Sequence, residues 1–328
     1  MKLLVTGSAG HLGEALMRSL RASGHEAFGI DLRPSPFTHA VGSIADRGFV
    51  AACMRGIEGV LHTATLHKPH VATHAKQAFV DANITGTLNL LEAAVAVDAR
   101  AFVFASTTSS YGRALTPEPG APAVWVTEET TPLPKNIYGV TKLAAESLCE
   151  LVHREHGLPC VVLRLSRFFP EDDDSRRTRA DFVDANAKVN EYLFRRVDIE
   201  DVVEAHLRAL ERAGALGFGR YIVSATTPLR RDDVAALRRD APAIVADRVP
   251  AYAAEYRRRG WTMFPSIDRV YVNDVARAAL GWQPRHDFTA IIERLGVGGD
   301  HRSALAQAIG AKGYHAARFD DGPYPVAP

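Results

Sequence analysis

Short apolar runs alternate with longer amphipathic stretches along the first half of the chain and beyond. The runs fit buried parallel strands, because such strands are covered by helices on both faces. They occupy 3–6, 27–30, 59–63, 101–105, 160–165 and 221–223. Between them, 12–22, 75–97 and 139–153 have the apolar spacing of helices that pack on a sheet. This alternation predicts a doubly wound α/β domain with a parallel sheet, a Rossmann fold.

The pattern becomes irregular after Leu165, where shorter helical segments replace the regular alternation. We therefore predict a dinucleotide-binding domain over 1–165 and a smaller C-terminal substrate-binding region. A helix-like stretch before the apolar run at 221–223 indicates that the chain returns to the first domain at about 198–226. The substrate-binding region then comprises 166–197 and 227–328.

Two other segments of this half have distinctive composition. Glu171 to Asp174 form an acidic run without the glycine and final glutamate of a calcium loop, so a solvated turn is predicted there. The tail from Phe319 to Pro328 contains three prolines and is predicted to be extended.

Composition narrows the classes of function. The chain has 328 residues, with 39 basic and 38 acidic side chains and a formal net charge of +1, so no nucleic-acid partner is expected. The apolar N-terminus stops at Thr6, too early for a signal peptide or a membrane span. Cys53, Cys149 and Cys160 are odd in number and widely spaced, which fits neither a disulfide framework nor a thiolate zinc site. We predict a cytoplasmic protein without a membrane partner.

A glycine motif follows the first predicted strand and opens a helix, the context that a dinucleotide fingerprint requires. Gly7 would permit the tight turn, Gly10 the approach of the pyrophosphate, and Gly13 close helix packing. Asp31 ends the second strand and can accept hydrogen bonds from the ribose hydroxyls, which favours NAD over NADP. Arg33 could instead pair with a 2′-phosphate, but Asp31 would repel that group. The alternative is a glycine-rich turn followed by an acid that caps a helix.

Tyr138 and Lys142 lie one helical turn apart, on the same face of a predicted helix. A free phenol has a pKa of about 10, and a nearby ammonium group would lower that pKa towards the range of a catalytic base. Hydroxyl side chains gather at 106–110, directly after a predicted strand, where open α/β sheets place their sites. One of them could support the charge that develops on a substrate oxygen. A Ser/Thr-rich turn with local backbone bonds remains the alternative.

Three further motifs complete a family pattern: the strand 60–64 with His62, Asn83 to Thr87 on the long helix, and Arg195 to Val202 at the start of a late helix. With the glycine motif and the Tyr138/Lys142 pair, they resemble the extended short-chain dehydrogenase/reductase family, the NAD-dependent epimerase/dehydratase group. The resemblance covers most of the chain. It implies hydride transfer at a carbinol carbon of a sugar or a sugar nucleotide.

The resemblance also assigns roles to individual residues. It implies that the catalytic residues are Thr107, Tyr138 and Lys142. It implies NAD contacts from Gly7, Gly10, His11, Leu12, Gly13, Asp31, Arg33, Ser43, Ile44, Thr63, Ala64, Asn83, Tyr138 and Lys142. Candidate substrate contacts are His67, Lys68, Thr107, Thr108, Ser109, Arg164 and Asn186. Asn190, Glu191 and Arg195 are weaker candidates in the same region.

The departures from the family pattern bear on the reaction. Thr108-Ser109 replaces the Asp-Glu pair that dehydratases of the family carry after the catalytic threonine, which disfavours water elimination. The short span between Arg164 and Arg196 suits a smaller substrate. A sugar epimerase is the first hypothesis. A net dehydrogenase of a small sugar, lactone or alcohol is the second, and a non-catalytic nucleotide sensor is the third.

Two further expectations concern metals and assembly. His67, His70 and His74 have a spacing that suggests metal ligands, but Pro69 interrupts any helix that would align them, so no metal site is predicted. By the resemblance, the helices 83–97 and 138–154 pair two subunits in a homodimer. Their apolar faces could equally belong to the core.

Overall fold

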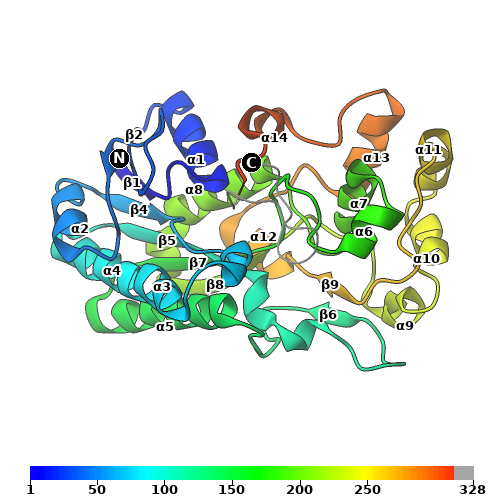
Figure 1. Ribbon diagram of the computed structural model, residues 1–328, viewed down its shortest axis with the longest axis horizontal. Coiled ribbons are helices and arrows are strands. Elements are labelled where there is room, and N and C mark those ends of the chain that lie inside the picture. The colour runs from blue at the N-terminus through cyan, green and yellow to red at the C-terminus, as the bar shows by residue number, and fades with distance from the viewer. Residues whose placement is uncertain (314–328) are drawn as a thin grey trace.

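A seven-stranded parallel sheet forms the centre of the molecule in the computed structural model, which describes residues 1–313 (Figure 1). The strand order is β3-β2-β1-β4-β5-β7-β8. The strands are β1 (Lys2–Thr6), β2 (Glu26–Asp31), β3 (Ala40–Val41), β4 (Gly59–His62), β5 (Ala101–Thr107), β7 (Cys160–Leu165) and β8 (Phe218–Val223). The order reverses direction beside β1, which creates the crevice where doubly wound folds bind nucleotides. The predicted fold class is confirmed.

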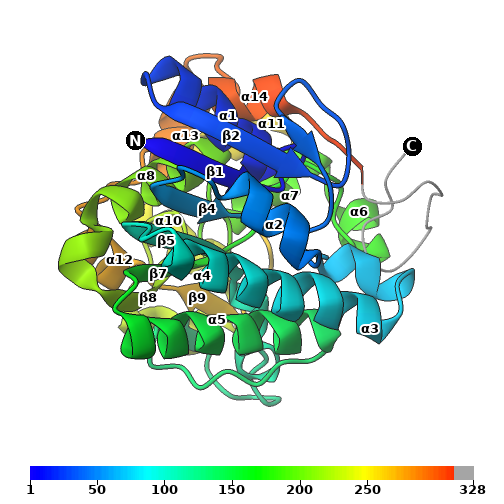
Figure 2. The same cartoon turned by 90° about the vertical axis from the view of Figure 1, so that its left-hand side faces the viewer.

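Helices cover both faces of this sheet (Figure 2). One face carries α1 (His11–Ala22) and α8 (Ile199–Leu216), whose apolar side chains share a core with β1, β5 and β7. The opposite face carries α2 (Arg47–Cys53), α4 (Gly86–Ala96) and α5 (Ile137–His156). The strands are buried from both sides, which explains why their sequences are apolar without alternation.

The long helix predicted over 75–97 is interrupted. It consists of α3 (Lys76–Phe79), a π-helical turn (Val80–Thr85) and α4. The π-helical turn contains Asn83, whose side chain bonds to a neighbouring loop. Turns of this kind often occur at functional sites.

A smaller region with its own apolar core lies beside the carboxyl ends of the strands, and we call it the cap. It contains a two-stranded parallel sheet, β6 (Val124–Val126) with β9 (Arg269–Tyr271). Its helices are α6 (Arg176–Asp181), α7 (Asp184–Glu191), α9 (Val234–Leu237), α10 (Ala241–Arg248), α11 (Ala251–Arg259) and α13 (Phe288–Gly296). Two others, α12 (Asp274–Leu280) and α14 (Ala304–Ile309), pack against α8.

Sequence reasoning did not identify β3, β6 and β9, which are only two or three residues long. Short 3-10 turns at 68–72, 108–111, 113–115 and 231–233 complete the structure. The predicted extended tail, 319–328, lies outside the described residues.

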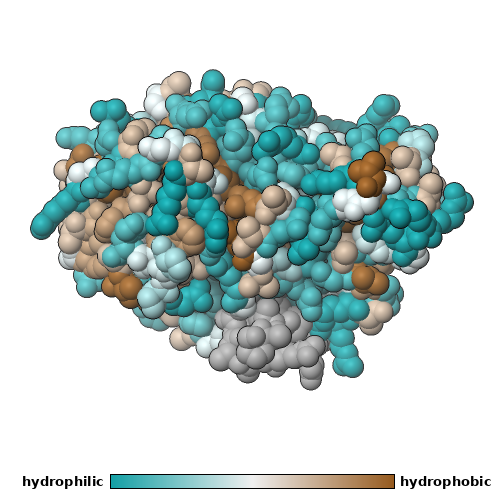
Figure 3. All heavy atoms as spheres, turned by 90° about the horizontal axis from the view of Figure 1, so that it is seen from above, coloured by the Kyte–Doolittle hydropathy of each residue, from teal (hydrophilic) through white to brown (hydrophobic). Residues whose placement is uncertain are grey.

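Hydrophilic side chains dominate the face seen from above, with a few apolar residues between them (Figure 3). Within residues 1–313, no helix is both long enough and apolar enough to cross a membrane.

Candidate active site

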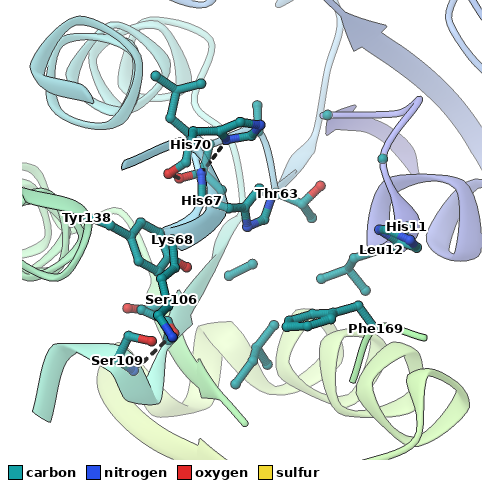
Figure 4. Close-up of a pocket in the computed structure, with 18 of the residues that line it drawn as sticks. His11, Leu12, Thr63, His67, Lys68, His70, Ser106, Ser109, Tyr138 and Phe169 are labelled. Atoms are coloured by element: carbon teal, nitrogen blue, oxygen red, sulfur yellow. Dashed lines mark hydrogen bonds between the residues drawn. The ribbon is translucent and has the colours of Figure 1, made fainter. Parts of the chain in front are cut away.

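A cavity of about 650 Å³ lies at the carboxyl edge of the sheet. Residues at or after the ends of β1, β2, β4, β5 and β7 line it, together with side chains from the cap. In the close-up of Figure 4, His11, Leu12 and Phe169 lie at one end, and Tyr138, Ser106 and Ser109 lie at the other. The cavity therefore joins the predicted cofactor motif to the predicted chemical group.

Backbone packing explains two of the three motif glycines. Gly7 has φ +73°, and a Cβ there would lie 2.8 Å from the amide nitrogen of Ala64. A Cβ at Gly13 would lie 1.9 Å from the carbonyl oxygen of Gly7, so any side chain there would force the backbone to shift. A Cβ at Gly10 would meet only that same oxygen, at 3.2 Å, so this glycine keeps the cavity side open. The amino end of α1 thus reaches the cavity as a dinucleotide phosphate requires.

Asp31 connects the end of β2 to the glycine loop. Its Oδ2 accepts a hydrogen bond from the backbone N–H of Ala9 at 3.0 Å, and its Oδ1 accepts one from the backbone N–H of Arg33 at 2.9 Å. Carboxylate oxygens can accept further bonds, so ribose hydroxyls could still be bound. Arg33, Ser43 and Ile44 line the same cavity. These residues fit the adenosine half of NAD.

Buried side-chain hydrogen bonds fix the end of β4 and the residues after it against Thr6 of β1. His62 bonds to Thr6 through Nδ1 at 2.7 Å and to Thr87 through Nε2 at 3.0 Å, which makes it a structural residue. Thr63 and Ala64, both predicted cofactor contacts, line the cavity, and their backbone N–H groups donate to Thr6 Oγ1.

Asn83, a predicted cofactor contact, does not line the cavity and is corrected to a supporting role. It is only 2% exposed. Its amide oxygen accepts from Leu66 N and Thr65 Oγ1, both at 2.8 Å, and its amide nitrogen donates to Thr141. Because Thr65 and Leu66 line the cavity, Asn83 shapes the loop that follows β4.

Tyr138 and Thr107 meet at the chemical end of the cavity. Burial raises the pKa of Tyr138 to about 12, and a hydrogen bond with the Thr107 side chain offsets part of that rise. Thr107 Oγ1 also accepts a bond from Ser109 N at 3.1 Å. Thr108 and Ser109 line the cavity beside them. The spatial grouping of these hydroxyls was expected from the sequence.

Lys142 differs from the prediction, because it is 1% exposed and does not line the cavity. Nζ donates to the carbonyl oxygen of Ala105 at 2.6 Å and lies 3.9 Å from the centroid of the Phe104 ring. Burial lowers the pKa of Lys142 to about 7. The expected lowering of the Tyr138 pKa by Lys142 is therefore absent, and burial of the phenol dominates.

Arg164, a predicted substrate contact, is instead part of a buried ion pair. Its Nε and Nη2 donate to the carboxylate of Glu146, with Nη2 at 2.7 Å, and its Nη1 donates to Tyr111 Oη at 3.0 Å. Arg164 is 3% exposed and Glu146 is fully buried. Ser106 Oγ donates to the same carboxylate at 2.5 Å. The network fixes β5, β7 and α5 beneath the site, and the predicted substrate contact is wrong for Arg164.

Asn186 is likewise remote from the cavity. Its side-chain amide makes two hydrogen bonds with the main chain of Thr262, donating at 3.0 Å and accepting at 3.1 Å. Asn190 donates to the same carbonyl group and accepts from Tyr256. Both asparagines fasten α7 to the segment after α11, so we correct Asn186 to a structural residue of the cap.

The loop after β4 contributes His67 and Lys68 to the cavity, as predicted for substrate contacts. The His67 ring extends into the cavity near Tyr138, with 6.2 Å between their centroids (Figure 4). Its backbone N–H donates to His70 Nδ1 at 2.9 Å, and burial lowers its pKa well below the usual value. A neutral imidazole beside the phenol can bond to a substrate hydroxyl.

The acidic run 171–174 corrects another prediction, because it is not a solvated turn. Glu171 and Asp173 are 4% and 8% exposed. Glu171 pairs with His11, and Asp173 and Asp174 pair with Arg167. Sequence alone offered no signal for the pair with His11, which lies 160 residues before Glu171.

Several cavity residues were missed. The cap side of the cavity is lined by Lys135, Arg167, Phe168, Phe169, Asp174, Arg269, Tyr271 and Lys312. Arg195, a weaker candidate, also lies there. These residues come from segments with irregular sequence patterns, so only the assembled cap brings them together.

The family model described as "NAD dependent epimerase/dehydratase family" matches residues 3–223. The chain belongs to this family. The membership confirms the predicted family.

Similar proteins include both epimerases and dehydrogenases. A UDP-glucose 4-epimerase of Rhizobium meliloti (strain 1021) is 27% identical over 89% of this chain and 94% of its own length. An L-arabinose 1-dehydrogenase (NAD(P)(+)) of Haloferax volcanii is 30% identical over 52% of this chain and 69% of its own length. Three other curated relatives, each 32% identical, are matched over 39%, 55% and 50% of their lengths.

Among solved structures, a short-chain dehydrogenase/reductase superfamily protein from Agrobacterium tumefaciens with bound NAD has a TM-score of 0.62. It is 24% identical, and the match covers 91% of this chain and 98% of that one. This likeness supports the fold of the epimerase/dehydratase family.

Proposed function

We propose that this family member is an NAD-dependent epimerase that acts at a carbinol carbon of a sugar or a sugar nucleotide. One observation carries the proposal: a single cavity connects the glycine loop and Asp31 with Tyr138 and Thr107. The cofactor would supply a hydride acceptor and donor at that end. The Rhizobium relative, a UDP-glucose 4-epimerase, supports this class of reaction.

In the proposed chemistry, Tyr138 exchanges a proton with the substrate hydroxyl. Thr107 holds that hydroxyl in position. A phenol with a pKa of about 12 is a proton donor at neutral pH, as return of a proton to a ketone oxygen requires. Removal of a proton needs a lower pKa, which the positive charge of oxidised nicotinamide would favour. Lys142 would have to rotate from Ala105 to reach the nicotinamide ribose.

The cap side of the cavity favours a substrate that is both cyclic and anionic. Lys135 supplies positive charge, and Phe169 and Tyr271 supply aromatic surface. Arg195 and Arg269 pair with Glu191 and Asp268, but a guanidinium has five N–H donors and can bind a further anion. Guanidinium groups bind phosphate oxygens well, and aromatic rings pack on sugar or base rings. This composition supports a sugar nucleotide over a free sugar.

The test is a panel of nucleotide sugars, incubated with the purified protein with and without added NAD. An epimerase converts one epimer into the other with cofactor that stays bound, and no reduced NAD accumulates. Stoichiometric accumulation of NADH would contradict epimerisation. It would favour the second candidate, a net sugar dehydrogenase like the Haloferax relative.

We also propose a homodimer that forms through α4 and α5, which lie side by side on one face of the sheet (Figure 2). Their inner residues belong to the core, but Val140 and Leu151 are 49% and 37% exposed on α5. Light scattering of the protein and of Leu151→Glu tests this. A monomeric parent protein would contradict it.

A further inference from the structure

The loop that follows β7 lines the cavity and then enters the acidic segment 171–174. Phe168 and Phe169 of this loop line the cavity. Figure 4 shows the Phe169 ring at the same end as His11 and Leu12 of the glycine motif. The acidic segment therefore begins beside the proposed pyrophosphate site, although it provides none of the predicted cofactor contacts.

Glu171 joins three separate parts of the chain. One carboxylate oxygen lies 2.8 Å from Nε2 of His11, at the start of α1. The same oxygen accepts hydrogen bonds from the backbone N–H groups of Lys312 and Gly313, at 3.0 and 3.3 Å. Lys312 Nζ in turn contacts the carboxylate of Glu14 on α1 at 2.5 Å. The Glu171 side chain is fully buried.

Asp174 makes the corresponding attachment on the opposite wall. It pairs with Lys68 in the loop after β4, and with Arg167 Nη2 at 3.1 Å. Burial alone would raise the pKa of Asp174, but Arg167 and Lys68 lower it to about 2, so the carboxylate is ionised at neutral pH. Lys68 and Arg167 both line the cavity.

We propose that the acidic segment 171–174 is a clamp that keeps NAD in the cavity between turnovers, with Glu171 and Asp174 as its positioning residues. The two carboxylates fasten one loop to α1 and to the β4 loop, which form opposite walls of the cavity. A dinucleotide that leaves past Phe169 has to displace this loop and break both attachments. Charge-assisted hydrogen bonds are among the stronger polar contacts, so their rupture slows release.

The inference rests on the proposed function for its purpose, because an epimerase reuses one cofactor molecule whereas a dehydrogenase exchanges it. Its test does not need a sugar substrate. The NAD-loaded protein is mixed with an excess of a fluorescent NAD analogue, and the exchange rate reports release of NAD.

Three variants probe the clamp, and a fourth is the control. Glu171→Gln removes the charge and keeps the shape, and Asp174→Asn does the same at the other attachment. A chain ending at Ala311 removes Lys312 and Gly313 together with the rest of the tail, 314–328. Asp172→Asn is the matched control, since the neighbouring Asp172 is exposed. We expect each of the three variants to accelerate NAD exchange by about 10-fold or more, and the control to leave the rate unchanged.

The outcomes separate the two proposals. Exchange at the parent rate in Glu171→Gln and in the shortened chain would overturn the clamp, even with epimerase activity intact. Faster exchange in a protein that never epimerises would support the clamp and contradict the proposed function. Should Glu171→Gln fail to fold, Asp174→Asn and the shortened chain give the same comparison.

Discussion

The cofactor half and the cap half of the cavity are built by different means. In the cofactor half, Gly7, Gly13 and Asp31 come from the first two strands and the helix between them. Backbone packing requires glycine at Gly7 and Gly13, and the Asp31 carboxylate bonds to the glycine loop. In the cap half, cavity residues come from segments more than a hundred residues apart, such as Arg167 and Arg269. A site built from local spacing can be recognised in a sequence, whereas a site built from tertiary packing cannot.

Replacement of the phenol should have the largest effect at the junction of the two halves. Tyr138→Phe removes the proposed proton donor, and general acid–base groups contribute about 10²- to 10⁴-fold to rates. We expect turnover to fall within that range while NAD affinity stays within about threefold. Steady-state kinetics and a cofactor titration measure both. A variant with parent turnover would remove Tyr138 from the mechanism.

Loss of the buried Arg164 should lower the free energy of unfolding and leave cofactor binding unchanged. Arg164→Met leaves the Glu146 carboxylate buried with weaker partners, a change that costs about 3–5 kcal/mol when a buried pair is broken. We expect denaturant unfolding to show this loss. The double variant Arg164→Met/Glu146→Leu removes the stranded charge and should recover most of it. A large change in substrate KM at parent stability would restore Arg164 as a substrate contact.

The close approach of the glycine loop predicts a smaller, localised effect. Gly13→Ala places a methyl group against the Gly7 carbonyl oxygen, and overpacking of this kind costs about 1–3 kcal/mol. We expect weaker NAD binding by about 10-fold. Gly214→Ala is the control, because nothing lies within 4 Å of its Cβ position in α8. Equal NAD affinities in the two variants would contradict the backbone argument.

The smallest effect should be the one that substitution of Asp31 has on the choice between NAD and NADP. Asp31→Ala removes an acceptor for the ribose hydroxyls and the charge that would repel a 2′-phosphate. We expect NAD affinity to fall several-fold and the preference for NAD over NADP to narrow. Binding titrations with both cofactors measure the change, and Asp46→Ala, a helix cap elsewhere, serves as control. An unaltered preference would mean that Asp31 does not discriminate.

The contrast between local sequence patterns and tertiary packing also explains which features of the fold and the site could be predicted. The apolar runs identified six of the seven sheet strands, because burial on both faces leaves a continuous apolar signature. The two-residue β3 carries no such signature. The sequence suggested that the polar side chains of Arg164 and Asn186 contact a substrate. In the structure, Arg164 is paired with Glu146, and Asn186 is hydrogen-bonded to Thr262. Lys142 was placed on the correct helix, yet its head group turns to Ala105, which helical spacing cannot reveal.

The acidic segment shows the limit most clearly. A run of four acids suggests a solvated surface, yet its ends pair with His11 and Lys68 on opposite walls. Their sequence separations, 160 and 106 residues, exceed any local pattern. Burial of an unpaired carboxylate would cost free energy, and the pairs of Glu171 with His11 and of Asp174 with Lys68 offset that cost.

The most direct test of hydride chemistry in this cavity uses a sugar nucleotide labelled with deuterium at the carbinol carbon. We expect the epimerised product to keep the label, because the hydrogen would be transferred to bound NAD and returned. We also expect Tyr138→Phe to suppress the conversion. Epimerised product that has exchanged its label with solvent hydrogen would contradict hydride transfer to and from bound NAD.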